Sequence, residues 1–301
     1  MRSIPYVQTS VFVDDKYPFG GNQLATYWNA DLNKTIPTDV MQGMALEMNF
    51  SESTFIEKTT KKDCSFKVRI FTPGSEIPFA GHPTLGTSFV LKHKGLIEQT
   101  TKNTTLELGV GSVPVEYLDS GFIQMQQSSP KFLQTLDEPT LVTEALGLKP
   151  EDILQEFPIQ SVSTGFPFLI IPLRNLAAVE RAVPNPQLIL NNLKKFGIQE
   201  VLIFAKEGIH TDSDVHARMF APRVGILEDP ATGSAAGPLG AYLEKYNAIL
   251  NHTIGEEIRI EQGYEINRPS LLSVRVPTEK MEQVLVAGKT RLTAEGTFIL
   301  Q

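Results

Sequence analysis

The sequence predicts an α+β protein made of two similar domains. Short segments that alternate between apolar and polar residues outnumber helical patterns, and the helical patterns lie scattered among them rather than in regular alternation. A pair of short motifs also recurs about half the chain later, which is typical of a duplicated domain. The length of 301 residues exceeds the size at which one core usually stops growing, so two domains are expected.

Alternation predicts strands along most of the chain. The predicted strands are 7–14, 65–72, 105–109, 113–118, 122–127, 257–262, 271–276, 283–288 and 290–300. The glycine-containing segment GVGSV, residues 109–113, leads directly into a strand, so we interpret it as a hairpin and not as a nucleotide-binding loop.

Helical periodicity and end signals predict five helices, at 37–49, 82–95, 140–148, 185–197 and 234–247. Thr38 or Asp39 is the candidate cap of the first helix. The polar, turn-rich segment 128–140 is interpreted as the link between the domains. We therefore expect a first domain of residues 1–127 with about 286–301, and a second of residues 128–285.

The repeated motif is the most informative feature. RIFTP at 69–73 recurs as RMFAP at 218–222, and each is followed by Glu-x-Pro-x-x-Gly at the start of a predicted helix. The two skeletons consist of Glu76, Pro78 and Gly81 in the first half and Glu228, Pro230 and Gly233 in the second. In two related domains such helix starts are expected to face one another across a cleft, which is a favoured place for a ligand.

Helix N-termini present unpaired N–H groups and partial positive charge, so they suit a carboxylate or a phosphate. Gly81 and Gly233 have no Cβ and would let a ligand approach the backbone. His82 and Ser234 follow these glycines and are candidates for side-chain contacts with the ligand. The alternative is that these residues only cap helices, which is a common role.

Glu52 lies between a predicted helix and a strand, with Phe50 and Phe55 nearby. Partial burial there would raise its pKa toward that of a general base, although a solvated turn is the ordinary role of such a residue. Asn22 in the segment Gly-Gly-Asn is a second ambiguous candidate, since this tripeptide is usually a turn.

Other classes of function are disfavoured. The net charge of −7 argues against a nucleic-acid surface, and the single cysteine, Cys64, excludes an internal disulfide and a cysteine-based zinc site. No segment is apolar for long enough to span a bilayer, so we expect a cytoplasmic protein without membrane contact. His210, Asp212, Asp214 and His216 alternate, but alternation alone does not predict a metal site. Tyr264 and Glu265 are interpreted as surface residues.

Several long motifs resemble the PhzF-like family, the phenazine-biosynthesis proteins built on the diaminopimelate epimerase fold. They include VFVDDKYPFGGNQLA, NFSEST, FTPGSEIPFAGHPTLG, STGFPFLI and EDPATGSAAGPLGAYL, spread over most of the chain. The resemblance implies two pseudo-symmetric domains, each a β-barrel-like sheet wrapped around a central helix, with the active site between them. It also implies a homodimer and no metal or organic cofactor.

The resemblance further implies an isomerase that moves a carbon-bound proton, as in the isomerisation of trans-2,3-dihydro-3-hydroxyanthranilate. Glu52 would be the general acid/base, with His82, Asp229 and Ser234 in the catalytic set. Asn22, Gly81, Gly233 and Ser234 would bind a small substrate that carries a carboxylate. The related epimerases use two cysteines at the helix starts, and the composition of this chain excludes that chemistry. The alternative is a scaffold of the same fold that binds carboxylates or proteins without turnover.

Overall fold

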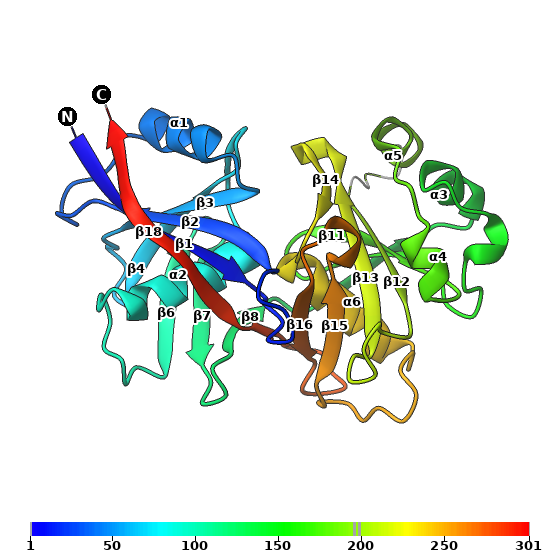
Figure 1. The fold of residues 1–301 in the computed structure, drawn as a ribbon. Coiled ribbons are helices and arrows are strands. Elements are labelled where there is room, and N and C mark those ends of the chain that lie inside the picture. Colours follow the sequence, from blue (N-terminus) through cyan, green and yellow to red (C-terminus); the bar gives the residue numbers. More distant parts are fainter. Residues whose placement is uncertain (1, 195–196, 198–199, 301) are drawn as a thin grey trace. The chain divides into compact units, whose positions relative to one another are not determined.

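The computed structural model describes residues 2–194, 197 and 200–300. It divides into two compact units (Figure 1). The first comprises the chain up to Asp15, Gly21–Gln126 and the chain from Ala287 onward, and the second comprises Lys16–Gly20 and Gln127–Val286. Among the described residues, no helix has the length and apolar character that crossing a membrane requires.

The first unit contains one continuous run of paired strands and two helices. Its strands are β1 (Arg2–Val11), β2 (Asn22–Trp28), β3 (Glu52–Glu57), β4 (Phe66–Phe71), β5 (Glu76–Ile77), β6 (Asn103–Leu108), β7 (Gly111–Tyr117), β8 (Ile123–Gln127) and β18 (Thr290–Leu300). The last residue of β8, Gln127, belongs to the second unit. Its helices are α1 (Thr38–Met48) and α2 (Gly81–His93). The strand order is β18-β1-β2-β3-β4-β6-β7-β8, and β5 forms a short second partner of β4.

The second unit repeats this plan with more helices. Its strands are β9 (Lys131–Thr135), β10 (Gln160–Ser163), β11 (Pro167–Pro172), β12 (Val201–Ala205), β13 (Val215–Ala221), β14 (Ile226–Asp229), β15 (Ile258–Gln262) and β16 (Ser270–Arg275), and β17 (Val284–Gly288) spans the boundary between the units. Its helices are α3 (Pro139–Ala145), α4 (Leu176–Glu180), α5 (Pro186–Leu193) and α6 (Gly233–Lys245), with short 3-10 turns η1 (Pro150–Asp152), η3 (Pro222–Val224) and η4 (Tyr264–Ile266).

The two units share a pattern of strand directions. In the first, the pairs from β1 to β7 run antiparallel, parallel, antiparallel, parallel and antiparallel. In the second, the pairs from β10 to β16, with β14 set aside, follow the same sequence of directions. The predicted α+β class with two pseudo-symmetric halves is therefore confirmed.

A helix buried on nearly all sides forms the centre of each unit. Helix α2 packs against β1, β2, β3 and β18, and α6 packs against β10, β11 and β16. A Cβ on Gly86 of α2 would lie 2.5 Å from Leu24 Cδ2, and one on Gly240 of α6 would lie 2.3 Å from Val274 Cγ1. Glycine is therefore required where strand side chains reach the helix axis most closely.

Further helices cover the other face of each sheet (Figure 1). In the first unit, Met41 and Met44 of α1 are buried in a cluster with Tyr27, Phe55 and Phe71. In the second, α3, α4 and α5 bury apolar side chains against the core strands β11 and β12. Each sheet therefore separates two hydrophobic layers, which explains why its central strands are apolar on both faces.

Most predicted elements are present, but strands β2, β5 and β10–β14 were not predicted, and there are three further differences. The segment 128–140, interpreted from the sequence as the link between the domains, also contains strand β9, which pairs with β10. Helix α4 was not predicted, because its five residues are too few to show periodicity. The N-cap of α1 is Pro37 rather than Thr38 or Asp39. Part of the end of the helix predicted at 185–197 lies outside the described residues.

The repeated motifs form the same ion pair in both units. Arg69 of β4 makes two hydrogen bonds to Glu76 of β5, at 2.8 and 2.6 Å, and Arg218 of β13 makes two to Glu228 of β14, at 2.9 and 2.8 Å. The side chains of the second pair are only 6% and 7% exposed, against 16% and 41% in the first. Arg218 also donates to the carbonyls of Val179 and Ala182.

The difference in burial predicts different contributions to stability. Glu228→Ala leaves a buried guanidinium without its carboxylate and should lower the free energy of unfolding by about 3–5 kcal/mol. Glu76→Ala, its counterpart in the repeat, should cost about 1 kcal/mol or less because water replaces the lost carboxylate. Urea-induced unfolding followed by circular dichroism would measure both. Equal losses in the two variants would contradict this assignment.

Candidate functional site

Glu52 and His82 lie next to each other in the first unit. Glu52 is the first residue of β3, and His82 is the second residue of α2. The distance from His82 Nε2 to Glu52 Oε2 is 3.6 Å, which is contact but slightly beyond hydrogen-bond range. The Glu52 side chain is 13% exposed, so of the two alternatives that the sequence left open it is partly withdrawn from water and not in a fully solvated turn.

The imidazole of His82 is neutral at physiological pH. Its side chain is 4% exposed, and this burial lowers its pKa to about 3 although the ring is hydrogen-bonded to the backbone of Gln23. Nε2 has no hydrogen-bond partner among the described residues, so the ring nitrogen bonded to Gln23 is Nδ1. Because a bond that favours the protonated ring must be donated by it, Nδ1 carries the proton and donates it to the Gln23 backbone. Nε2 therefore presents a lone pair to the carboxyl group of Glu52.

Strand pairing places these groups around the start of α2. Leu24 of β2 pairs with Glu52 of β3, and Asn22, the buried first residue of β2, precedes Gln23. Gly81 opens the helix, and its N-cap residue Ala80 makes no side-chain capping bond. Since alanine has no capping oxygen, the N–H groups of the first turn are oriented to receive an anion.

The second unit places Asp229 and Ser234 around the start of α6. Asp229 ends β14 and is buried, and its Oδ2 accepts a 2.5 Å hydrogen bond from the Thr232 hydroxyl. Thr232 is the N-cap residue of α6 and makes no side-chain capping bond, because its hydroxyl is directed to Asp229. Gly233 is buried and Ser234 is half-buried in the first turn. This helix start, like that of α2, lacks a side-chain cap.

Two glutamines that sequence reasoning missed hold the start of α6. Gln262 Nε2 donates to the Asp229 carbonyl at 2.7 Å and to Thr232 Oγ1 at 3.0 Å, and Gln262 Oε1 accepts from the Thr232 N–H at 3.2 Å. Gln127 Nε2 donates to the Gly233 carbonyl at 2.8 Å. Each glutamine is the last residue of its strand, and that shared position was the available signal.

A family model described as "Phenazine biosynthesis-like protein" (PhzC-PhzF) matches residues 10–296. The chain belongs to this family. A trans-2,3-dihydro-3-hydroxyanthranilate isomerase of Pseudomonas aeruginosa is 36% identical over 98% of the chain and 99% of that relative. The uncharacterized isomerase YfhB of Bacillus subtilis is 33% identical over 87% of the chain and 86% of its own length.

Solved structures agree with the PhzF assignment. The crystal structure of a PhzF-family phenazine biosynthesis protein of Bacillus anthracis matches with a TM-score of 0.87 and 28% identity, over 100% of both chains. A probable proline racemase of Agrobacterium radiobacter matches with a TM-score of 0.67 at 11% identity, over 99% of this chain and 93% of its own, and this likeness concerns the fold alone. The predicted family is confirmed, and with it the isomerase class of enzyme.

The alternating residues 210–216 of this PhzF-family chain do not converge on one point. His210 is hydrogen-bonded to Tyr17, Asp212 accepts from Lys16, and His216 lies between two glutamates. Within the described part of the chain, no group of three or more His, Cys, Asp or Glu side chains is arranged to hold a metal ion.

His216 instead forms the centre of a buried charged cluster. Its Nδ1 lies 3.2 Å from Glu261 Oε2 and its Nε2 lies 2.9 Å from Glu265 Oε1, and the His216 side chain is fully buried. The interpretation of Tyr264 and Glu265 as surface residues was wrong, because η4 packs them against His216. Burial, the largest influence, would lower the pKa of His216, but the hydrogen bonds and negative charges of the two glutamates raise it to about 9.

This cluster predicts a loss of stability at alkaline pH. Because the pKa of His216 is higher in the folded chain than its unfolded value of 6.5, its contribution is complete below pH 6.5 and disappears as the pH rises through about 9. The whole effect corresponds to about 3 kcal/mol. Urea unfolding at a series of pH values should show this decline in the wild type.

The decline should be absent in His216→Gln and present in His252→Gln. His252 is a matched control because it also pairs with a buried glutamate, Glu244, at 2.8 Å, on a different part of the second unit. An undiminished alkaline slope in His216→Gln would show that another group is responsible.

Proposed function

We propose that the chain is a cofactor-independent isomerase that moves a carbon-bound proton on a small cyclic amino or hydroxy acid. Glu52 serves as the general acid/base. The observation that carries this proposal is a partly buried carboxyl group beside the unprotonated Nε2 of a neutral, buried His82. The isomerase relative at 36% identity supports the same class of substrate, because the substrate in its name is a cyclic hydroxy amino acid.

The chemistry requires one group that both takes and returns a proton. The Glu52 carboxylate removes a proton from carbon, the electron pair of the C–H bond moves into the substrate π system, and the same proton returns at another carbon. Substrate and product then differ only in the position of a proton and a double bond. General acid/base catalysis of this kind contributes about 10²–10⁴-fold to the rate.

His82 is suited to stabilise the protonated form of Glu52. With Nδ1 committed to the Gln23 backbone, Nε2 is an acceptor, and a small movement from 3.6 Å would bring it within hydrogen-bond range of the protonated carboxyl group. A protonated imidazole would instead stabilise the Glu52 carboxylate and weaken it as the base that removes the proton from carbon. The low pKa of His82 is therefore part of the proposed mechanism.

The helix starts supply the complementary positive potential. The uncapped N–H groups at Gly81 and Gly233 bind the substrate carboxylate and the negative charge that develops on the substrate. In this proposal Asn22 and Ser234 donate further hydrogen bonds, and Asp229 pairs with a substrate amino group. Gln262 positions this part of the second unit by holding the backbone on both sides of Pro230 and Ala231.

Proton–deuterium exchange tests the role of Glu52. In D₂O, NMR would follow exchange and isomerisation of trans-2,3-dihydro-3-hydroxyanthranilate and a panel of cyclic amino acids. We expect Glu52→Gln to bind a substrate but to lose about 10²–10⁴-fold in rate. Glu57→Gln is the matched control, since Glu57 lies on the same strand but pairs with Lys67 at 3.1 Å.

Each outcome has a distinct meaning. Normal turnover by Glu52→Gln would remove this residue from the proposed role. Saturable binding without exchange by the wild type, across the panel, would favour the carboxylate-binding scaffold over the isomerase.

We also infer that the chain acts in the cytoplasm as a homodimer. The first inference rests on the single cysteine, which fits a reducing compartment, and the second rests on the family resemblance. Sedimentation velocity at micromolar concentration should give the mass of two chains of 33.3 kDa. A single species with the mass of one chain would contradict the dimer.

A further inference from the structure

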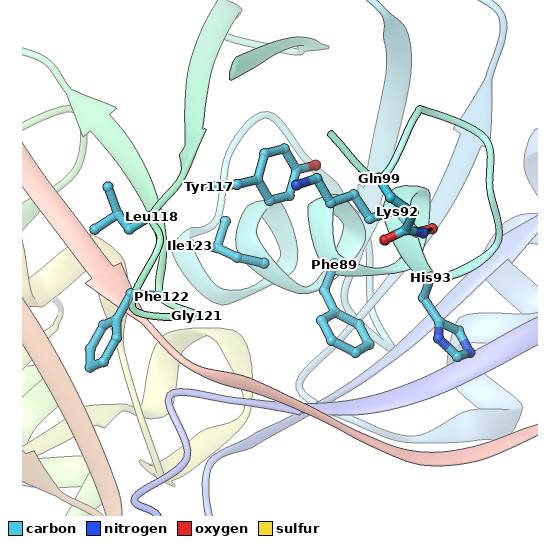
Figure 2. A pocket seen from close by; sticks show the side chains of 9 residues that line it. All are labelled: Phe89, Lys92, His93, Gln99, Tyr117, Leu118, Gly121, Phe122 and Ile123. Carbon is cyan, nitrogen blue, oxygen red and sulfur yellow. Dashed lines mark hydrogen bonds between the residues drawn. The ribbon is translucent and has the colours of Figure 1, made fainter. Parts of the chain in front are cut away.

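A second pocket lies in the first unit, beside the C-terminal half of α2 (Figure 2). Its volume is about 330 Å³, and it is lined by Phe89, Lys92, His93, Gln99, Tyr117, Leu118, Gly121, Phe122 and Ile123. These residues come from the last turns of α2, the segment that follows it, and the β7–β8 hairpin. His82 belongs to the first turn of the same helix, so this pocket is distinct from the candidate site.

Aromatic rings form much of the wall. Figure 2 shows Phe89 and Tyr117 on either side of Ile123, with Phe122 and Leu118 at the other end of the pocket. The Tyr117 hydroxyl donates a 2.8 Å hydrogen bond to the Ser88 carbonyl, which fastens this ring to α2. The Phe89 ring stacks on His93 with a centroid distance of 5.8 Å. The pocket therefore offers several fixed ring faces and edges to a planar apolar group.

Lys92 supplies a positive charge inside this aromatic wall. Its Nζ lies 4.1 Å from the centroid of the Tyr117 ring (Figure 2). Among the residues that the structure describes, no carboxylate lies within 4.0 Å of this ammonium group.

Two carboxylates near the pocket already have cationic partners. Glu295 is bonded to His93 and, at 3.0 Å, to Lys94. Asp119 pairs with Lys102 at 3.5 Å. A second ammonium group, that of Lys289, lies 5.5 Å from the Phe122 ring and pairs with Asp15. Among the lysines beside the pocket, Lys92 is therefore the one whose positive charge is available to a ligand carboxylate.

We propose that this pocket binds a small aromatic carboxylate. The ring of the ligand lies among Phe89, Tyr117 and Phe122, and its carboxylate accepts hydrogen bonds from Lys92 Nζ. The volume falls within the range of about 300–1,000 Å³ that small-molecule sites occupy. A charge-assisted bond to a partly desolvated ammonium group gives preference for an anion over a neutral analogue. None of the nine lining side chains is a carboxylate that would repel the ligand.

Titration calorimetry with 2-naphthoate, and with 2-naphthamide as its neutral analogue, tests the proposal. We expect saturable binding of the acid to the wild type and at least tenfold weaker binding of the amide. Lys92→Met should weaken acid binding by at least tenfold, while Lys92→Arg should retain most of it. Lys102→Met is the matched control, because it removes an exposed lysine of the same unit that does not line the pocket.

A second experiment tests where the aromatic acid binds, independently of the charge of Lys92. Phe122→Trp places an indole in the pocket wall, and its fluorescence should change with the same saturation curve as the calorimetric signal. Binding should persist in Glu52→Gln, and Lys92→Met should keep its exchange activity, so the pocket and the proposed isomerase can succeed or fail separately.

Three results would overturn the proposal. They are the absence of saturable acid binding to the wild type, equal binding of acid and amide, and unchanged acid binding by a Lys92→Met variant whose circular dichroism matches the wild type.

Discussion

Burial of one helix inside each sheet is the constraint on which the rest of the structure depends. A helix surrounded by strands needs residues without a side chain where strand side chains approach its backbone most closely. Gly86 and Gly240 meet this need in α2 and α6. Once the helix is enclosed, its first turn has a defined position at the end of the sheet. Its N–H groups then stay oriented there without a side-chain cap, at Ala80 in one unit and Thr232 in the other. A stable core and the proposed anion-binding end thus have one origin.

The pKa values of two buried histidines, one in each unit, shift in opposite directions because their partners differ. His82 has only a backbone partner to favour its charged form, so desolvation lowers its pKa to about 3. His216 is no less buried, but two glutamates raise its pKa to about 9. The first arrangement provides a neutral acceptor beside Glu52, which suits proton transfer. The second arrangement is a structural ion cluster that stabilises the second unit.

Helix α2 connects two chemically different environments in the first unit. Its first turn holds His82 against Glu52, and its last turns place Phe89 and Lys92 in the aromatic pocket. The β7–β8 hairpin closes that pocket through the bond from Tyr117 to Ser88. The helix is buried between these ends, so each environment is shaped by a different set of strands. This separation is why the two proposals can be tested with different variants.

The class of fold, the family, and the residues that open the two central helices follow from the sequence alone. These features are local: alternation marks strands, and the repeated RIFTP and RMFAP motifs mark equivalent strand ends. Three contacts became visible only in the folded chain: His82 lies against Glu52, Gln262 holds the backbone at Asp229, and Glu265 is bonded to His216. Each of these contacts joins residues far apart in the chain. Their pairing depends on strand register and helix burial, and single-sequence patterns do not encode either directly.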